Sequence, residues 1–259
     1  MTGLKGSLLK EKIASGQPII GTFVGTADPL MARLFAQLGF DYIIIDTEHH
    51  AINNETLQQM LLYFEGTQTC PIVRVPWHEP AWTKWALDFG AEGIMFPNIM
   101  DAAAAHQAVS NCKYPPQGSR GFFPKNASNF LMDLGEYLQD INERILVWTQ
   151  IEHFQAVENL DQILQVPGID ALYIGPADLS LSMGILGKYD DPRYLETVET
   201  IFSKAHQAGV PVAYHLYEDS PEFVNKIRHG VQIYSYGMDW LFAQQAAASY
   251  LNNFRDLLK

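Results

Sequence analysis

The sequence has 259 residues, of which 47% are hydrophobic and 18% charged, a balance typical of a compact globular protein. Its net charge of -12 argues against a nucleic-acid partner, and its two cysteines, Cys70 and Cys112, are too few for a disulfide framework or a thiolate metal cluster. The charged N-terminal stretch lacks a secretory core, and no apolar run approaches the roughly 20 residues that span a membrane, so we expect a cytoplasmic protein without membrane partners.

Short apolar runs alternate with longer segments of helical periodicity along the chain, and runs such as YIIID are apolar throughout, as in buried parallel strands. The predicted strands are Ile19–Val24, Tyr42–Ile45, Pro71–Val75, Gly93–Phe96, Ile145–Ile151, Ala171–Ile174, Val210–Leu216 and Gln232–Tyr236. The predicted helices are Pro29–Leu38, Asn54–Glu65, Pro80–Phe89, Ala102–Asn111, Ala156–Leu164, Tyr194–Ala208, Pro221–His229 and Leu241–Leu258.

Eight such βα units predict one α/β domain over residues 1–259, a (β/α)8 TIM barrel. The alternative is an open doubly wound sheet, but the first strand is followed by GTADP, which is not the GxGxxG of a dinucleotide-binding loop. The longest irregular stretch runs from Lys113 to about Leu131, and long loops in compact domains are usually functional or contact a partner. The last helix carries an apolar stripe that either covers its own barrel or packs against a neighbouring subunit.

Reactive side chains of a (β/α)8 barrel lie at the carboxyl ends of the strands and in the loops that follow. The polar residues at these positions are Asp46, Glu48, His49, His50, Arg74, Asn98, Gln150, Glu152, Asp178 and His215. Their convergence on one rim predicts an active site there.

Glu152 and Asp178 follow adjacent strands, and two carboxylates with a few waters suit an all-oxygen site for Mg2+ or Mn2+. Each acid also precedes a helical segment, so helix capping is the alternative reading. The turn Gly175-Pro176-Ala177-Asp178 opens a helix, and its free N–H groups would suit a carboxylate.

Arg74 lies in the otherwise apolar strand PIVRV, where a buried cation implies an anion, either a protein carboxylate or the substrate. His49 and His50 are consecutive, so they cannot face the same direction, and either one is a candidate acid/base. None of the eight predicted strands contains the lysine that a Schiff-base aldolase needs, so any carbanion formed here requires a metal as its electron sink.

Several motifs between Ile20 and Ala246 carry a family resemblance; they are GFDYIIIDTEH, PIVRVPW, ALDFGAEGIMFPN, YPPQGSRG, VWTQIE and VPGIDALYIGPADLSLSMG. With these motifs the sequence resembles the HpcH/HpaI family of class II, metal-dependent pyruvate aldolases. The resemblance implies a lyase that reversibly cleaves a 4-hydroxy-2-keto acid, such as a 2-keto-3-deoxy sugar acid, to pyruvate and an aldehyde through a metal-bound enolate. The alternatives are oxaloacetate decarboxylation and a citrate-synthase-like condensation by the same enolate chemistry.

The resemblance also implies roles for the residues that bind metal and substrate. Glu152 and Asp178 would bind the divalent metal, which is Mg2+ or Mn2+, with Co2+ or Zn2+ as alternatives. Gln150 would contact the bound ligands, and the pyruvate carboxylate would lie on the backbone N–H groups of Ala177 and Asp178. Arg74 would hold the keto oxygen and stabilise the enolate.

His49 matches the family's acid/base, and Asp88 matches the acid paired with it, from a neighbouring strand end or a neighbouring subunit. The family forms hexamers in which the last helix is exchanged, so the resemblance implies a homo-oligomer. We expect His215 to contact the substrate, because it lies in a strand-seven region that is aliphatic in typical relatives. Phe122, Phe123 and Tyr217 also depart from the family pattern; they favour a bulkier, more apolar aldehyde or a subunit contact.

Overall fold

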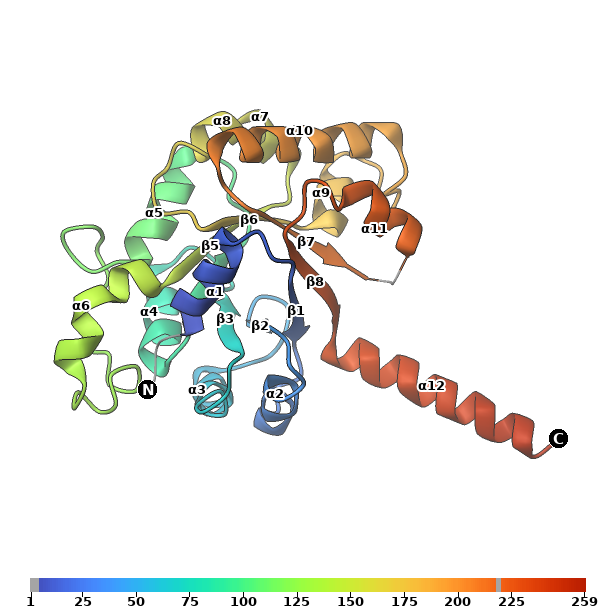
Figure 1. Cartoon of the computed structure of the whole chain (residues 1–259), viewed down its shortest axis with the longest axis horizontal. Coiled ribbons are helices and arrows are strands. Elements are labelled where there is room, and N and C mark those ends of the chain that lie inside the picture. Colours follow the sequence, from blue (N-terminus) through green and yellow to red (C-terminus); the bar gives the residue numbers. More distant parts are fainter. Residues whose placement is uncertain (1–4, 218–219) are drawn as a thin grey trace.

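The computed structural model describes residues 5–217 and 220–259; residues 1–4 of the charged N-terminal stretch lie outside the described residues. The strands are β1 (Ile19–Val24), β2 (Tyr42–Asp46), β3 (Cys70–Arg74), β4 (Gly93–Phe96), β5 (Leu146–Ile151), β6 (Ala171–Ile174), β7 (Val212–Leu216) and β8 (Ile233–Met238). All neighbouring strands are parallel, and β8 pairs with β1, which closes the sheet into a barrel (Figure 1). The predicted (β/α)8 barrel is confirmed, and the open sheet is excluded.

Helices follow the strands around the barrel. They are α1 (Lys5–Ala14), α2 (Pro29–Ala36), α3 (Asn54–Leu62), α4 (Pro80–Phe89), α5 (Ala102–Cys112), α6 (Leu134–Arg144), α7 (Phe154–Glu158), α8 (Leu160–Ile163), α9 (Pro176–Ser182), α10 (Pro192–Ala208), α11 (Pro221–Ile227) and α12 (Asp239–Leu257). Polar side chains fix several of their starts: Asp28, Asn53 and Asp101, for example, accept hydrogen bonds from first-turn N–H groups.

The observed strands differ from the predicted ones by at most two residues at either end. The helix predicted over Ala156–Leu164 is instead two short helices, α7 and α8, which meet at Asn159. The helices α1 and α6 were not among the predicted elements, and α9 was expected only as a helix opened by the turn Gly175-Pro176-Ala177-Asp178, without bounds. Leu9 and Ile13 of α1 belong to the same apolar cluster as the interior strand residues, so this helix closes the amino-terminal end of the barrel.

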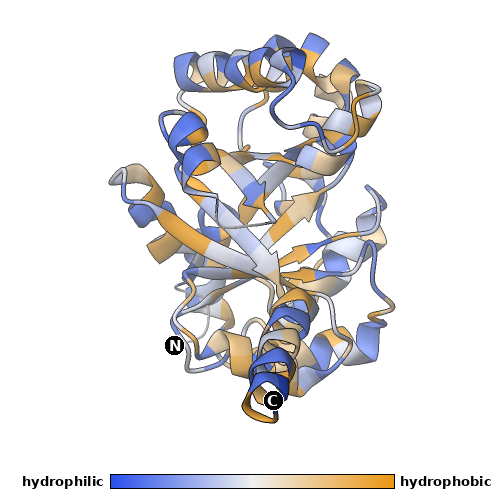
Figure 2. Ribbon diagram, turned by 90° about the vertical axis from the view of Figure 1, so that its right-hand side faces the viewer, coloured by the Kyte–Doolittle hydropathy of each residue, from blue (hydrophilic) through white to orange (hydrophobic). Residues whose placement is uncertain are grey.

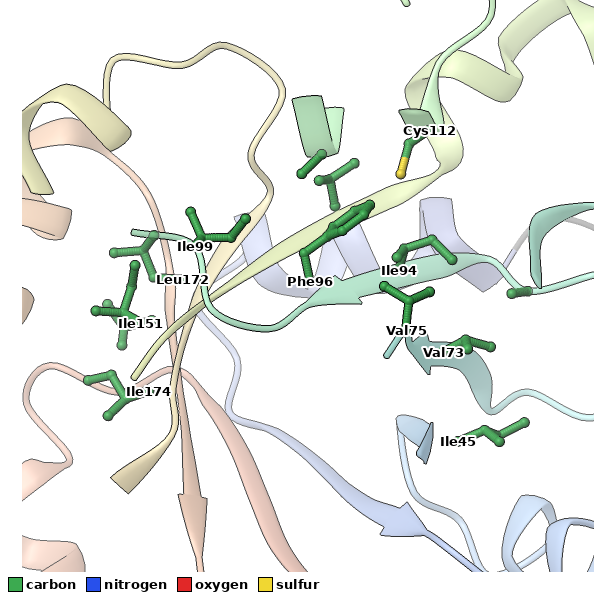
Figure 3. Packing of buried hydrophobic residues seen from close by; sticks show 14 of the residues in the cluster. Ile45, Val73, Val75, Ile94, Phe96, Ile99, Cys112, Ile151, Leu172 and Ile174 are labelled. Carbon is green, nitrogen blue, oxygen red and sulfur yellow. The ribbon is translucent and has the colours of Figure 1, made fainter. Parts of the chain in front are cut away.

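Two apolar layers explain why the strands are hydrophobic on both faces. Outward-facing residues such as Ile45, Val73, Ile94 and Leu172 belong to the layer between sheet and helices (Figure 3). Inward-facing residues fill the barrel, among them Tyr42, Ile44, Ile72, Met95, Trp148 and Tyr173. These side chains fill the interior toward the amino-terminal end of the barrel. A site is therefore expected at the opposite end, where the carboxyl ends of the strands lie.

The helix α12 projects away from the barrel of its own chain (Figure 1). Asp239 at its start is buried, whereas residues 243–259 are all exposed. Figure 2 looks onto the end of this helix and shows hydrophobic residues along its surface, and Tyr250, Leu251, Phe254 and Leu257 are among the large exposed apolar side chains. The helix therefore does not cover its own barrel. Within the described ranges, no helix combines the length and the apolar character needed to cross a membrane.

Candidate active site

Asp46 and Arg74 form the buried centre of the site. The register of β2 and β3 places them opposite each other, and Arg74 donates from Nε to Asp46 Oδ1 at 2.9 Å and from Nη2 to Oδ2 at 2.8 Å. Burial disfavours ionisation of Asp46, but hydrogen bonds and charge from Arg74 and His50 outweigh it and lower its pKa. The anion predicted for Arg74 is thus a protein carboxylate, and the guanidinium is held in a fixed plane.

The third nitrogen of the Arg74 guanidinium, Nη1, faces Glu48 and not Asp46. Arg74 Nη1 lies 3.1 Å from Glu48 Oε2, and the guanidinium carbon lies 4.9 Å from the centre of the Phe23 ring. Burial raises the pKa of Glu48, and the positive charge of Arg74 opposes that rise. Nη1 is therefore the donor of Arg74 that is not committed to Asp46.

Glu152 is the most strongly perturbed carboxylate of the rim. Burial raises its pKa to about 7; the hydrogen bond from the backbone N–H of Asn98, 2.7 Å from Oε1, lowers it, and the charges of Glu48 and Asp178 raise it further. Gln150 donates from Nε2 to Glu152 Oε2. Burial is the main cause of the raised pKa, and the negative charges of Glu48 and Asp178 add to it, so a cation bound beside these carboxylates would relieve their repulsion.

Gly175 makes room for this arrangement at the end of β6. A Cβ atom at that position would lie 2.8 Å from Gln150 Nε2 and 2.9 Å from Glu152 Oε2, closer than side-chain carbons pack. Asp178 lies in the first turn of α9, where helical geometry leaves the N–H groups without an acceptor in the helix itself. The structure thus places Gln150 and Glu152 at the end of β5 and Asp178 in the first turn of the helix that follows β6.

Glu152, Asp178 and Gln150 together offer oxygen donors of the kind that a divalent metal takes. No three His, Cys, Asp or Glu side chains lie close enough to form a metal cluster within residues 5–217 and 220–259. Two carboxylates, Glu152 and Asp178, are present, and Gln150 Oε1 is buried without a hydrogen-bond partner among the described residues. Two carboxylates beside an unsatisfied amide oxygen fit a hard cation that completes its coordination with water or substrate.

The two consecutive histidines face different ways. His50 Nδ1 lies 2.7 Å from Asp46 Oδ2, and 25% of its side chain is exposed. The side chain of His49 is 61% exposed, and its Nε2 is 3.7 Å from Glu48 Oε2, which is too long for a hydrogen bond. His50 is therefore held inside the chain, whereas His49 is open to solvent at the rim.

Asp88 lies in a different environment from His49. It is near the end of α4, and its carboxylate accepts a 2.8 Å hydrogen bond from Arg120 Nη2. A helix that follows a strand runs back toward the amino-terminal end of the barrel, away from the rim that carries His49. In the part of the chain that the structure describes, no hydrogen bond or ion pair joins Asp88 to His49.

His215 lies on β7 among aromatic rings. Its ring makes edge-on contacts with Phe23 at 5.2 Å and Tyr217 at 4.5 Å between centroids, and its Nδ1 is 3.2 Å from the Ser235 hydroxyl. Burial, assisted by the positive charge of Arg74, lowers the pKa of His215 to about 3. This histidine is neutral at physiological pH, so it offers a hydrogen bond or an apolar face, not a charge.

Asp46 was recognised at the rim but had no assigned role in the sequence analysis. Its central place follows from two signals that the sequence contains: it ends β2, and the next strand ends in the only arginine of the predicted strands. Paired strand ends of opposite charge are the signal that would have found it.

The sequence pattern of the family described as HpcH/HpaI aldolase/citrate lyase matches residues 19–246. The 5-keto-4-deoxy-D-glucarate aldolase of Escherichia coli O157:H7 (strain EC4115 / EHEC) is 32% identical over 202 residues, which cover 78% of this chain and 79% of that protein.

Solved structures agree with this result. The HpcH/HpaI aldolase from Desulfitobacterium hafniense DCB-2 has a TM-score of 0.88 and 31% identity, and the alignment covers 95% of this chain and 96% of that one. The citrate synthase SbnG has a TM-score of 0.84 and 31% identity, with 96% and 97% of the two chains covered. The family thus contains both an aldolase and a synthase of similar structure.

Proposed function

The chain belongs to the HpcH/HpaI aldolase/citrate lyase family and is a carbon–carbon lyase, and we propose that it is a divalent-metal-dependent aldolase. Its reaction is the reversible cleavage of a 4-hydroxy-2-keto acid, such as a 2-keto-3-deoxy sugar acid, to pyruvate and an aldehyde. The observation that carries this proposal is the position of Arg74, clamped on Asp46, at the same rim as the carboxylates Glu152 and Asp178.

Glu152 and Asp178 would hold the metal, which is Mg2+ or Mn2+, with Co2+ or Zn2+ as alternatives. When bound, it acts as a Lewis acid toward the keto group of the substrate. Gln150 supports this site, because its buried Oε1 lacks a partner among the described residues and its Nε2 holds Glu152. The N–H groups of Ala177 and Asp178 would bind the pyruvate carboxylate.

Arg74 stabilises the negative charge that develops on the keto oxygen as the carbon–carbon bond breaks. Nε and Nη2 are committed to Asp46, whereas Nη1 carries two N–H groups, so it can face Glu48 Oε2 with one and donate to that oxygen with the other. A donor held in position before the reaction stabilises developing charge without reorganisation. The aromatic residues Phe23 and Tyr217 with neutral His215 would face the rest of the substrate, which favours a bulky or apolar aldehyde.

His49 is proposed as the acid/base that moves the proton of the aldol hydroxyl. Its exposure within one chain leaves it free to receive a partner from outside. We assign that partner to Asp88 of a neighbouring subunit, because Asp88 of the same chain is near the end of α4, away from the rim that carries His49. An acidic partner would orient the imidazole and strengthen it as a base.

The proposed assembly is a homo-oligomer, a hexamer by the family resemblance, in which α12 packs on another subunit. The exposed apolar residues of α12 support this arrangement, since a long helix with an uncovered apolar stripe is normally stabilised by packing.

The experiment that tests the function is exchange of the pyruvate methyl protons in D2O, followed by NMR. Chelator-treated protein should give no exchange, and added Mg2+ or Mn2+ should restore it. Arg74→Lys and Glu152→Gln should each slow exchange by at least about a hundredfold, the scale for loss of a positioned electrostatic group. Absence of exchange with every divalent metal in correctly folded protein would refute the pyruvate-enolate proposal.

The similarity to the citrate synthase SbnG supports a second candidate reaction for the enolate, condensation with an acyl donor. Aldehyde formation from 4-hydroxy-2-keto acids, oxaloacetate decarboxylation and condensation of oxaloacetate with an acyl donor are measured side by side. Aldol cleavage that exceeds the other two in kcat/KM supports the aldolase; a larger value for either rival assigns the enolate to that reaction.

A further inference from the structure

We propose that His50 is a positioning residue for Arg74: its ring and Arg74 hold the same carboxylate, Asp46, and thereby align the guanidinium for the reaction. This inference rests on the proposed function, in which Arg74 meets the developing negative charge. It assigns His50 a role separate from that of His49, which is at the exposed rim.

The argument starts from the donors around Asp46, which is fully buried. Oδ1 faces Arg74 Nε at 2.9 Å and the N–H of Glu48 at 3.1 Å, and Oδ2 faces Arg74 Nη2 at 2.8 Å and His50 Nδ1 at 2.7 Å. Arg74 holds Asp46 in the ionised form, so the carboxylate is an acceptor and the proton of this contact is on His50 Nδ1. His50 is thus the only side chain besides Arg74 that donates to Asp46 among the described residues.

The opposite edge of the His50 ring lies against a glycine. A Cβ atom at Gly25 would be 2.4 Å from His50 Nε2 and 2.5 Å from Cε1, so the ring occupies the space that a side chain would take. Gly25 does not have a left-handed backbone conformation, so only this contact requires glycine there. The ring is therefore confined between Asp46 on one side and the Gly25 backbone on the other.

The Gly25 backbone, which confines one edge of the His50 ring, is itself held in position. The N–H groups of Gly25 and Thr26 donate to the carboxylate of Asp239, at 3.1 and 2.9 Å, and Asp239 is buried at the start of α12. Three strand ends, those of β1, β2 and β8, therefore hold the His50 ring in place. Such support is what keeps a side chain within the narrow range of angles that a productive geometry requires.

The consequence concerns Arg74 Nη1. Each oxygen of Asp46 has one close donor outside the ion pair, the Glu48 N–H on Oδ1 and His50 Nδ1 on Oδ2, and together they fix the plane of the paired guanidinium and the direction of Nη1. Without His50, the one close donor left on Oδ2 is Arg74 Nη2, so the carboxylate and the guanidinium can turn together about the remaining contact of Oδ1 with the Glu48 N–H. A tilted guanidinium still attracts an anionic substrate but meets the developing charge less well, so the loss should appear in kcat more than in KM.

The first test compares three substitutions in the metal-loaded protein by the rate of pyruvate methyl exchange. The amide nitrogen of asparagine reaches the place of Nδ1, whereas that of glutamine reaches the place of Nε2. His50→Ala and His50→Gln should lower kcat about tenfold, the equivalent of one buried hydrogen bond, with KM changed less than about threefold. His50→Asn should restore most of kcat. Equal loss in all three variants, or a loss confined to KM, would overturn the proposal.

The second test uses Gly25→Ala. The added methyl group would displace the His50 ring from its position without changing Asp46 or Arg74. In the native background it should lower kcat about as much as His50→Ala. In the His50→Ala background it should have no further effect, because the clash is gone. Additive losses would show that Gly25 acts through something other than His50.

A third readout does not depend on activity. Solvent exchange of the Arg74 Nε proton, followed by NMR in protein with labelled arginine, should be slow in native protein and His50→Asn and at least about tenfold faster in His50→Ala. Unchanged exchange in His50→Ala would refute the alignment even if the lyase assignment holds. If native protein turns over no pyruvate with any metal, the proposed function fails, and this proton still reports whether His50 fixes Arg74.

Discussion

The backbone N–H of Asn98 donates a 2.7 Å hydrogen bond to the Glu152 carboxylate, which links the loop after β4 to the end of β5. Asn98 has a left-handed backbone conformation, with φ of 51°, and asparagine tolerates this better than most residues. The strained residue thus directs a donor at a carboxylate that would bind the metal.

Asn98→Ala should weaken metal binding by about tenfold, because alanine disfavours the left-handed conformation by roughly 1–2 kcal/mol and would turn the N–H away from Glu152. Calorimetric titration with Mn2+ measures the change. Asn98→Gly is the matched control, since glycine adopts the same backbone conformation without cost and should bind the metal nearly as well as the native protein. Equal weakening in both variants would show that the Asn98 side chain, not its N–H, matters.

Metal affinity should depend steeply on pH below neutrality. The proton competes with the metal for Glu152, whose pKa burial raises to about 7, so Kd should rise about tenfold for each pH unit below 7 and level off above it. Titrations with Mn2+ from pH 5.5 to 8.5 measure the slope. Glu152→Gln should bind weakly with no slope in this range; a slope retained in that variant would assign the proton to another group.

The same shift predicts how the metal-free protein responds to pH. The folded-state pKa of Glu152 lies above the unfolded value, so its contribution to stability is present below the unfolded pKa and is lost as pH rises through about 7. Glu152→Gln should therefore increase the free energy of unfolding at pH 8 by on the order of 2 kcal/mol. Urea unfolding at pH 5 and pH 8 tests the sign: the gain should be small at pH 5.

Gly175→Ala should weaken metal binding while leaving the barrel folded. The added methyl group would meet Gln150 Nε2 and Glu152 Oε2 within 3 Å, and the extended backbone at Gly175 accepts alanine, so the effect is purely steric. We expect a loss of at least about tenfold in affinity, in line with the 1–3 kcal/mol typical of overpacking. Gly135→Ala, in open space on α6, is the control and should bind normally.

His215 should show no titration between pH 5 and pH 8. Burial lowers its pKa to about 3, so the folded protein keeps the neutral ring; the stability that this contributes is present above the unfolded pKa of about 6.5 and is lost progressively as pH falls from there toward 3. The chemical shift of its ring carbon proton, assigned with His215→Gln, measures this. A midpoint near 6 would show that the ring is open to water or faces a carboxylate.

Charged substitutions in the apolar stripe of α12 should dissociate the proposed oligomer. Leu251→Glu and Phe254→Glu each place a charge among exposed apolar side chains, and sedimentation velocity should show smaller species. Asn252→Glu lies on the other side of the helix and should leave the assembly intact. Identical sedimentation of all three proteins would contradict docking through this stripe.

The barrel could be predicted from the sequence because its signal is repeated along the chain and because parallel strands are apolar on both faces. The helices α1 and α6 escaped prediction for a physical reason. In α6 the buried positions are Tyr137, Ile141 and Arg144, so the helix is amphipathic, but its few apolar residues lie among many polar ones and do not stand out as a hydrophobic run. Similarly, α1 is a short charged segment whose role, closing the barrel end, depends on contacts distant in sequence.

The rim residues could also be predicted, since every strand end faces the same side and chain order alone locates them. What could not be predicted was the direction of side chains. His49 and His50 are adjacent in sequence, and the space left by Gly25 lies beside only one of them. The partner of Asp88 was equally hidden, because Arg120 is 32 residues away in an irregular loop.

The closure of the sheet has a consequence for how the chain folds. The Thr22 hydroxyl on β1 bonds to the carbonyl of Tyr236 on β8 across 214 residues of sequence. Until β8 is synthesised and docks, one edge of β1 is an unpaired strand edge, the kind of surface from which misassembly starts. The slowest folding step should therefore be this last docking, and strain or damage at the β8 end should increase aggregation of newly made chains before it affects the finished enzyme.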